Sequence, residues 1–239
     1  MLPDNLVADY CQQFFGFGSW SAKVWFIGLE EGGGWNEADV QGRLSTWQAG
    51  GRRSLEDAPE FYPTSKCHKW HGDDAKLQTT WKQLIRMLFI AQGKGDSDDA
   101  ILKYQRKWLG AFSGETCLAE LFPLPSPNTR TWLYSEWSNL VWLKERKTYE
   151  ARTMLSRACS LKRKIEENKP KVVIFYGATR LRSWSQISGG YFEQAIDGQL
   201  MRFKSDATMF FVTRHPAWET DEYFKKIGRF FRRHYGSSF

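Results

Sequence analysis

Apolar positions along the chain concentrate in four short runs that are rich in β-branched and aromatic residues. The runs cover residues 23–27, 116–121, 171–176 and 208–212. A short and nearly continuous apolar run is typical of a strand that is buried on both faces of a sheet. We therefore predict four central strands.

Apolar residues recur at helical spacing in the segments between and after these runs. The segments are 77–91, 100–112, 150–168 and 221–235. Strands that alternate with helices indicate βα units and a mostly parallel sheet. The predicted fold is α/β: one three-layer α/β/α domain with a central, mostly parallel four-stranded sheet.

Two stretches interrupt this alternation. Residues 36–74 are rich in glycine and charge, and residues 130–149 are rich in tryptophan. We predict both as insertions into a single domain that spans residues 1–239, and we expect the first to be irregular.

The composition narrows the class of protein. With 41% apolar residues the chain can bury a sizeable core, which argues against a disordered protein, and its formal net charge of +7 favours a polyanionic partner such as nucleic acid. No apolar run approaches the roughly 18 residues that span a bilayer. The N-terminus also lacks a basic leader followed by an apolar stretch. We expect a soluble, cytoplasmic monomer that has no membrane contact.

Cysteine and histidine spacing gives little sign of a metal site. The four cysteines are Cys11, Cys67, Cys117 and Cys159. They form no CxxC pair, so we predict reduced thiols rather than a disulfide framework or an iron–sulfur cluster. Cys67, His68 and His71 in KCHKWHGDD come nearest to a zinc motif but lack a second ligand pair at zinc spacing. We expect a loop here, and neither a metal nor an organic cofactor.

Chemically distinctive segments stand at the ends of all four predicted strands. They read GLEEGGG, ELFPLPSPN, YGATR and TRHPAW. In an open parallel sheet, ligands gather outside the carboxyl ends of the strands, so we expect these segments to line one cleft. Glu30 and Glu31 would then point into it. A plainer interpretation is that both carboxylates only stabilise the N-terminus of a following helix.

Two of these turns together resemble motifs of the uracil-DNA glycosylase superfamily. The segment from Gly28 to Gly32 resembles the superfamily's water-activating motif, with Glu30 at its third position. Residues 214–217, RHPA, resemble its His-Pro-Ser motif, with Ala217 in the serine's place, and the turn at Gly177 resembles the end of its third strand. These motifs are short and degenerate.

The resemblance implies a mechanism for cleaving an N-glycosidic bond. Glu30 would orient the water and stabilise the cationic sugar, while His215 would hydrogen-bond the departing base. For His215 the plain alternative is a packed histidine bonded to a backbone carbonyl.

Glu120 is the most informative departure from the superfamily's pattern. It stands in the place of an asparagine that reads the base. An ionised glutamate only accepts hydrogen bonds, so it suits the exocyclic amine of a cytosine-like base. The sequence therefore predicts a modified cytosine as substrate, as in prokaryotic antiviral glycosylases that act on phage DNA.

In a DNA duplex, the target nucleotide must be flipped into a pocket before the enzyme can reach it. The remaining site residues are predicted to bind this base or the surrounding DNA. Residues predicted to bind the base are Glu120, Trp35, Phe61, Tyr62 and Gly28. Residues predicted to bind DNA are Gly32, Gly33, Ser126, Asn128, Arg180, Arg214 and Trp218. Among the aromatics, Trp35, Phe61 or Tyr62 would stack on the base, and Trp218 would fill the space that the base vacates.

Other functions fit the same residues. The chain could be a uracil-DNA glycosylase of base-excision repair, or a noncatalytic reader of modified DNA on a glycosylase fold. It could also be a metal-dependent phosphodiesterase that uses Glu30, Glu31 and Asp73. A hydrolase of free nucleosides is a further alternative, which the basic charge balance disfavours.

Overall fold

A computed structural model describes residues 1–65, 70–72 and 74–239. Its described residues form an α/β structure around one mixed sheet of eight strands, in the order β3-β1-β4-β2-β5-β8-β7-β6. The strands are β1 (Gly16–Gly18), β2 (Val24–Gly32), β3 (Leu55–Glu56), β4 (Thr116–Ser126), β5 (Val172–Tyr176), β6 (Glu193–Ile196), β7 (Leu200–Lys204) and β8 (Met209–Thr213).

The four strands predicted from the sequence form the centre of this sheet. β2 pairs in parallel with β4 on one side and with β5 on the other, and β5 pairs in parallel with β8. Every residue of β5 is buried, as expected for a central strand that is covered on both faces. The prediction of a four-stranded sheet is nevertheless wrong, because four further strands extend it at both edges.

The added strands are short or weakly apolar. β1 has three residues and runs antiparallel to β4, and the two-residue β3 pairs with β1. At the other edge, β6 and β7 form an antiparallel hairpin whose outer strand is partly exposed. Such edge strands carry no continuous apolar run, so the sequence pattern did not reveal them.

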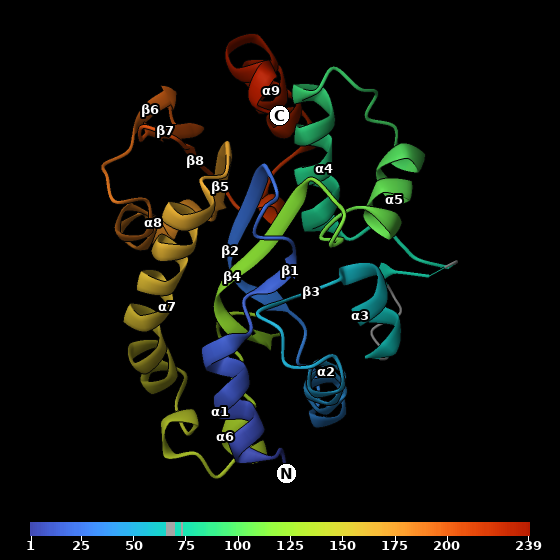
Figure 1. Cartoon of the computed structure of the whole chain (residues 1–239), viewed down its shortest axis with the longest axis vertical. Coiled ribbons are helices and arrows are strands. Elements are labelled where there is room, and N and C mark those ends of the chain that lie inside the picture. The colour runs from blue at the N-terminus through green and yellow to red at the C-terminus, as the bar shows by residue number, and fades with distance from the viewer. Residues whose placement is uncertain (66–69, 73) are drawn as a thin grey trace.

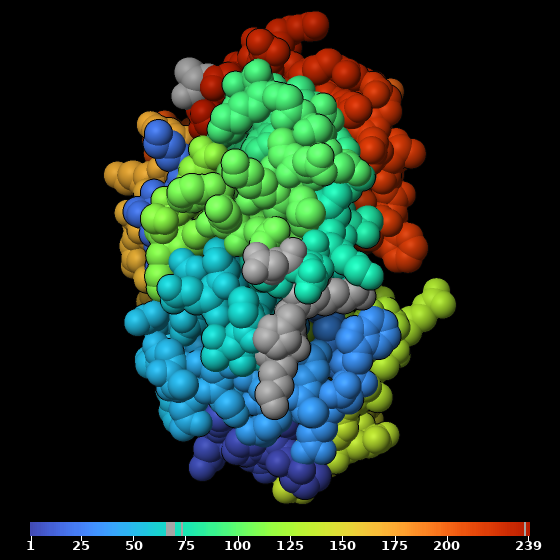
Figure 2. All heavy atoms as spheres, turned by 90° about the vertical axis from the view of Figure 1, so that its right-hand side faces the viewer, coloured from blue at the N-terminus to red at the C-terminus, as the bar shows by residue number. Residues whose placement is uncertain are grey.

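Helices cover both faces of the sheet. The α-helices are α1 (Asp4–Gln13), α2 (Glu37–Ala49), α3 (Ala58–Thr64), α4 (Thr79–Ala91), α5 (Asp98–Lys107), α6 (Tyr134–Trp137), α7 (Arg146–Asn168), α8 (Leu181–Ser188) and α9 (Asp221–Tyr235). Short 3-10 turns are η2 (Val141–Leu143), η3 (Ala178–Arg180), η4 (Pro216–Trp218) and η5 (Gly236–Ser238). α7 and α8 lie on one side of the sheet, and α4, α5 and α9 lie on the other (Figure 1). Figure 2 shows the latter side from outside, with α4 and α5 above the segment from α2 to α3.

The stretch 36–74 is not irregular throughout, contrary to the prediction. It contains α2, which has 13 residues and begins where the side chain of Asn36 accepts a hydrogen bond from the backbone N–H of Asp39. Val40, Leu44 and Trp47 form its buried stripe. The helix was missed because Arg43 shares this buried face and breaks the apolar pattern.

A bulge at the carboxyl end of β2 shapes the candidate site. Glu30 pairs with Phe122, but Gly32 pairs with Ser126, so three residues of β4 face a single residue of β2. Two of those three are Pro123 and Pro125, which have no backbone N–H to donate to the sheet. The regular hydrogen-bond ladder between β2 and β4 is therefore interrupted here. Bulges of this kind are common beside binding sites.

Among the described residues, none of the helices combines the length and the apolar character needed to cross a membrane.

Candidate active site

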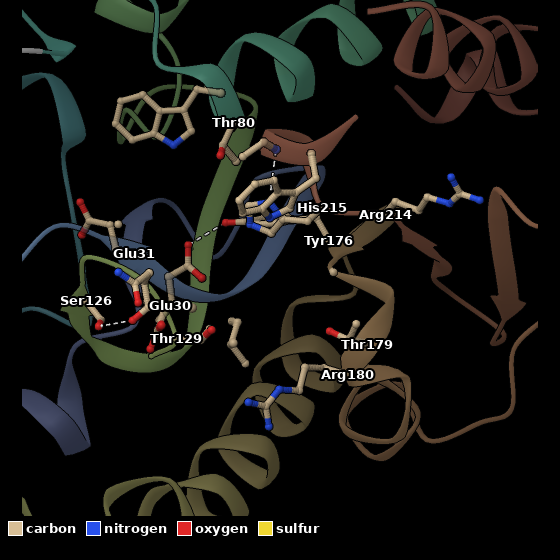
Figure 3. A pocket seen from close by; sticks show the side chains of 18 of the residues that line it. Glu30, Glu31, Thr80, Ser126, Thr129, Tyr176, Thr179, Arg180, Arg214 and His215 are labelled. Carbon is tan, nitrogen blue, oxygen red and sulfur yellow. Dashed lines mark hydrogen bonds between the residues drawn. The ribbon is translucent and has the colours of Figure 1, made fainter. Parts of the chain in front are cut away.

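A pocket of about 620 Å³ opens at the carboxyl ends of the four central strands (Figure 3). This volume falls within the range of about 300–1,000 Å³ that is typical of small-molecule sites. The predicted site residues that line it are Glu30, Gly32, Glu120, Ser126, Asn128, Arg180, Arg214, His215 and Trp218. All four strand ends thus contribute, as the sequence pattern predicted.

Glu30 enters the pocket from the end of β2 and is held by Arg146 at the start of α7. Nη2 of Arg146 donates a hydrogen bond to Oε2 of Glu30, and both side chains are largely buried. Burial raises the pKa of Glu30, and the charge of Arg146 opposes that shift. The ion pair therefore favours a charged carboxylate in a desolvated place.

The neighbouring carboxylate, Glu31, is bound from the opposite direction. Nη1 of Arg43 donates to its Oε2 at 2.8 Å, and the hydroxyl of Tyr62 donates to its Oε1. The two adjacent glutamates of the GLEEGGG turn are thus fixed by separate partners. Neither is a merely solvated charge at a helix start.

Glu120 projects from the middle of β4, beside Gly28 of β2. The hydroxyl of Tyr176 donates to its Oε1 at 2.7 Å, whereas its Oε2 is closed off from solvent and has no hydrogen-bond partner among the described residues. A Cβ atom on Gly28 would lie 2.2 Å from the Tyr176 hydroxyl and 2.3 Å from Oε2 of Glu120. Glycine at position 28 therefore leaves room for the pair of Glu120 and Tyr176.

The expectation of an ionised Glu120 needs correction. Burial raises the pKa of its carboxyl group to about 8, with the Tyr176 hydrogen bond acting in the opposite direction. Glu120 is thus mostly protonated at pH 7 and can donate a hydrogen bond as well as accept one.

His215 follows β8 and lies beside Tyr176, with 5.8 Å between the ring centroids. Its Nδ1 accepts a hydrogen bond from the backbone N–H of Ala217 at 3.2 Å. Burial lowers the pKa of the imidazole, which favours the neutral ring. Since Nδ1 acts as acceptor, the neutral ring carries its proton on Nε2 and offers a donor there.

The two arginines that line the pocket are both anchored by acidic partners. Arg180 bonds Glu150 at 3.4 Å, and Arg214 bonds Glu219 at 2.9 Å. Gly33, the remaining residue predicted to bind DNA, lies behind the pocket lining, where its N–H donates to the carbonyl oxygen of Ser126. Its role in DNA binding stays a prediction.

The structure does not bring the predicted stacking aromatics into the pocket. Phe61 and Tyr62 are buried in the core, so the prediction that either stacks on a base is wrong. Trp35 is 69% exposed and lies outside the residues that line the pocket. The helix α3 places Phe61 and Tyr62 inward, and the prediction that residues 36–74 are irregular did not anticipate this helix.

Other aromatic residues line the pocket instead. They are Trp70 and Trp81, which lie close to the start of α4, and Tyr176 at the end of β5. Tyr176 is the last residue of β5 and the first of the YGATR segment, so its position at a strand end was a usable signal. Trp70 and Trp81 precede or begin a helix and offered no such signal.

The earlier metal motifs fall partly outside the described residues. Cys67, His68 and Asp73 lie outside the described residues, while His71 is buried and its ring stacks on Tyr62, with 5.0 Å between the ring centroids. Within residues 1–65, 70–72 and 74–239, no group of three or more His, Cys, Asp and Glu side chains is arranged to hold a metal ion.

No protein-family model matches the chain, and no curated protein matches it significantly. The resemblance to the uracil-DNA glycosylase superfamily thus rests on the motif residues alone.

Proposed function

We propose that this protein is a monofunctional DNA glycosylase that hydrolyses the N-glycosidic bond of a flipped, modified base and leaves an abasic site. The observation that carries the proposal is the convergence of Glu30, Glu120 and His215 in one pocket, which opens at the carboxyl ends of the four central strands. The reaction requires three groups: an anion near the sugar, a group that forms hydrogen bonds with the edge of the base, and a neutral hydrogen-bond donor for the departing base.

The reaction follows from the placement of these groups. As the bond between C1′ and the base nitrogen breaks, the base keeps the electron pair and the sugar becomes cationic. Glu30 stabilises the cation and accepts a proton from the water whose oxygen bonds to C1′. Nε2–H of His215 donates a hydrogen bond to the departing base, so that its negative charge is stabilised as it develops.

The substrate that we propose is a cytosine derivative, such as glucosylated hydroxymethylcytosine in phage DNA, which would make the protein an antiviral enzyme. A volume of about 620 Å³ leaves space for a base with a large substituent. Trp70, Trp81 and Tyr176 supply aromatic surface for the flipped base. Ser126, Asn128, Arg180 and Arg214 supply polar groups for the flanking phosphates.

Uracil-DNA glycosylase activity is the second candidate. It is favoured by the raised pKa of Glu120, because a neutral carboxyl group can donate to O4 and accept from N3–H of uracil. Glu120 can therefore form hydrogen bonds with either uracil or cytosine. An assay on both substrates distinguishes the two candidate functions.

A panel of DNA duplexes tests the proposal. Each carries one uracil, cytosine, hydroxymethylcytosine or glucosylated hydroxymethylcytosine, and each is incubated with the protein in EDTA before alkali-labile sites and released bases are measured. We expect release from a modified cytosine. Release from uracil alone would favour the repair enzyme, strand breaks that need a divalent metal would indicate a phosphodiesterase, and binding without release would indicate a reader of modified DNA.

A further inference from the structure

The carboxyl group of Glu120 lies among charged neighbours, and within the described residues no cationic side chain forms a hydrogen bond to it. On β2, Glu30 and Glu31 are both acidic and disfavour a second negative charge. On β5, Tyr176 provides a neutral hydroxyl. On α7, the guanidinium of Arg157 donates to the backbone oxygens of Glu120, Leu121 and Phe14 rather than to the carboxyl group.

The other arginines near the site are bound elsewhere. Arg146 contacts Glu30 and Glu150, and Arg43 contacts Glu31 and Asp39. His215 faces the same pocket but is held in its neutral form. A desolvated carboxyl group beside two acids and without its own cation is expected to keep its proton.

We propose that Glu120 reads the flipped base as a neutral carboxylic acid, which donates one hydrogen bond to N3 of a cytosine and accepts another from its exocyclic amine. This inference rests on the proposed function and defines how that site selects its substrate. The two bonds pair a carboxylic acid with the Watson–Crick edge, so a substituent at C5 of the base stays free to occupy the rest of the pocket.

The neutral form matters because N3 of cytosine is an acceptor. An ionised Glu120 could accept a hydrogen bond from the exocyclic amine but could donate none to N3. Its negative charge would also repel the lone pair of N3. A neutral carboxyl group satisfies both positions. This pairing also explains why the buried Oε2 has no hydrogen-bond partner among the described residues: it gains one when a base is bound.

Tyr176 and Gly28 orient this group. The Tyr176 hydroxyl fixes Oε1, and the bare Cα of Gly28 leaves space for Oε2. The last torsion of a glutamate side chain is broad, so a small rotation can bring Oε2 toward a base while Oε1 keeps its hydrogen bond from Tyr176.

The test compares pH profiles of base release for the wild type, Glu120→Gln and Tyr176→Phe. The probe is a duplex with one glucosylated hydroxymethylcytosine, with the hydroxymethylcytosine and uracil duplexes run in parallel. For the wild type we expect kcat/KM to fall with an apparent pKa near 8, by about tenfold per pH unit above it. Glu120→Gln carries a permanent donor and acceptor, so its activity, even if reduced about tenfold, should not decline between pH 7 and 9.

Tyr176→Phe provides a signature that a merely structural role would not produce. Its hydroxyl lowers the pKa of Glu120, so its removal should move the alkaline decline to higher pH. A wild-type profile that stays flat to pH 9, together with a Gln variant that loses more than about a hundredfold at pH 7, would overturn the inference and indicate an ionised acceptor.

A spectroscopic measurement separates this inference from the proposed function. In the infrared difference spectrum of wild type minus Glu120→Gln, the C=O band of the protonated Glu120 carboxyl group should be present at pH 6.5 and vanish near pH 9.5, while the band of Glu56, which both proteins share, cancels. Absence of that band would overturn the neutral acid even if base is released. Presence of the band, with no base released from any duplex, would overturn the glycosylase and with it the assignment to a flipped base.

Discussion

Arg146 donates a hydrogen bond to Oε2 of Glu30 although the two residues lie 116 positions apart in the sequence. The same guanidinium bonds Glu150 at 2.9 Å and the hydroxyl of Ser126 at 3.2 Å. Arg146 thus ties the ends of β2 and β4 to the start of α7. In the proposed reaction it is a positioning residue that keeps Glu30 both oriented and charged.

Replacing Arg146 with Met should impair base release and change its pH dependence. Burial raises the pKa of Glu30 and Arg146 opposes it, so the pKa rises further when the arginine is lost. The reaction needs the ionised carboxylate, and the acid side of the pH–rate profile should therefore shift to higher pH. Breaking a buried ion pair should also lower the free energy of unfolding by about 3 kcal/mol.

The conservative variant Arg146→Lys serves as the control, because it keeps a positive charge but loses the multiple bonds of the guanidinium. We expect it to restore most of the pH profile and only part of the rate. A Met variant with a lower rate but an unshifted profile would restrict Arg146 to a structural role.

Gly28→Ala should disrupt the pair of Glu120 and Tyr176. The added methyl group would lie within 2.3 Å of atoms from both side chains, so one of them must move. We expect a loss of about 1–3 kcal/mol in the free energy of unfolding and a change in the ratio of release from modified cytosine to release from uracil. Denaturant unfolding and the two release rates measure these effects.

Gly32→Ala is the matched control on the same strand. No described atom lies within 4 Å of a Cβ at position 32, so the change should leave stability within about 0.5 kcal/mol of the wild type. Equal losses in both variants would show that the crowding at Gly28 has no special consequence.

The central strands could be predicted because burial on both faces demands continuous apolar runs, as in VVIFY of β5. Their carboxyl ends then located Glu30 and His215, since parallel strands end at one edge of the sheet. The edge strands and α2 were missed, because a three-residue strand has no pattern and a buried arginine disguises an amphipathic helix.

The spacing of residues in the sequence could not predict which side chains pair with one another. An ion pair such as Glu30 with Arg146 joins distant segments and leaves no periodic signal. The protonation of Glu120 depends on burial and on neighbours from three elements, none adjacent in sequence. Phe61 and Tyr62 were misassigned for a similar reason, because an aromatic residue in an unassigned segment suits a pocket or a core equally well.

The stability of the protein should depend on pH through Glu120. Its pKa in the folded state, about 8, lies above its ordinary value of 4.5, so the folded protein binds a proton that the unfolded chain releases. The protonated Glu120 contributes up to about 5 kcal/mol to the free energy of unfolding. This contribution is fully present below pH 4.5 and is lost as pH rises through about 8. Glu56, with a pKa raised by burial to about 7, titrates in the same direction.

Comparison with Glu120→Gln isolates the one carboxyl group, because Glu56 titrates in both proteins. The free energy of unfolding of the wild type, from chemical denaturation, should fall relative to the variant between pH 5 and 9. A constant difference across that range would contradict a protonated Glu120.

Trp218→Ala should affect duplex DNA more than single-stranded DNA. The side chain is 85% exposed directly after the His-Pro-Ala turn, where it can fill the space of a flipped base. We expect kcat/KM for the duplex to fall about tenfold, with a smaller loss on a single strand and no change in stability. Tyr191→Ala is the control, since Tyr191 is 93% exposed and lies outside the pocket lining. Equal losses on both substrates would contradict a wedge role.

The central claim is that Glu30 drives hydrolysis of a glycosidic bond, and Glu30→Gln tests it most directly because the change removes the charge and keeps the volume. The measurement is the amount of released base and of abasic sites, formed in EDTA from the best duplex of the panel, with DNA affinity determined in parallel. We predict equal amounts of base and abasic site with the wild type, and a loss of at least about a thousandfold in rate with Glu30→Gln while DNA affinity changes less than about tenfold. Wild-type release by Glu30→Gln would contradict the account.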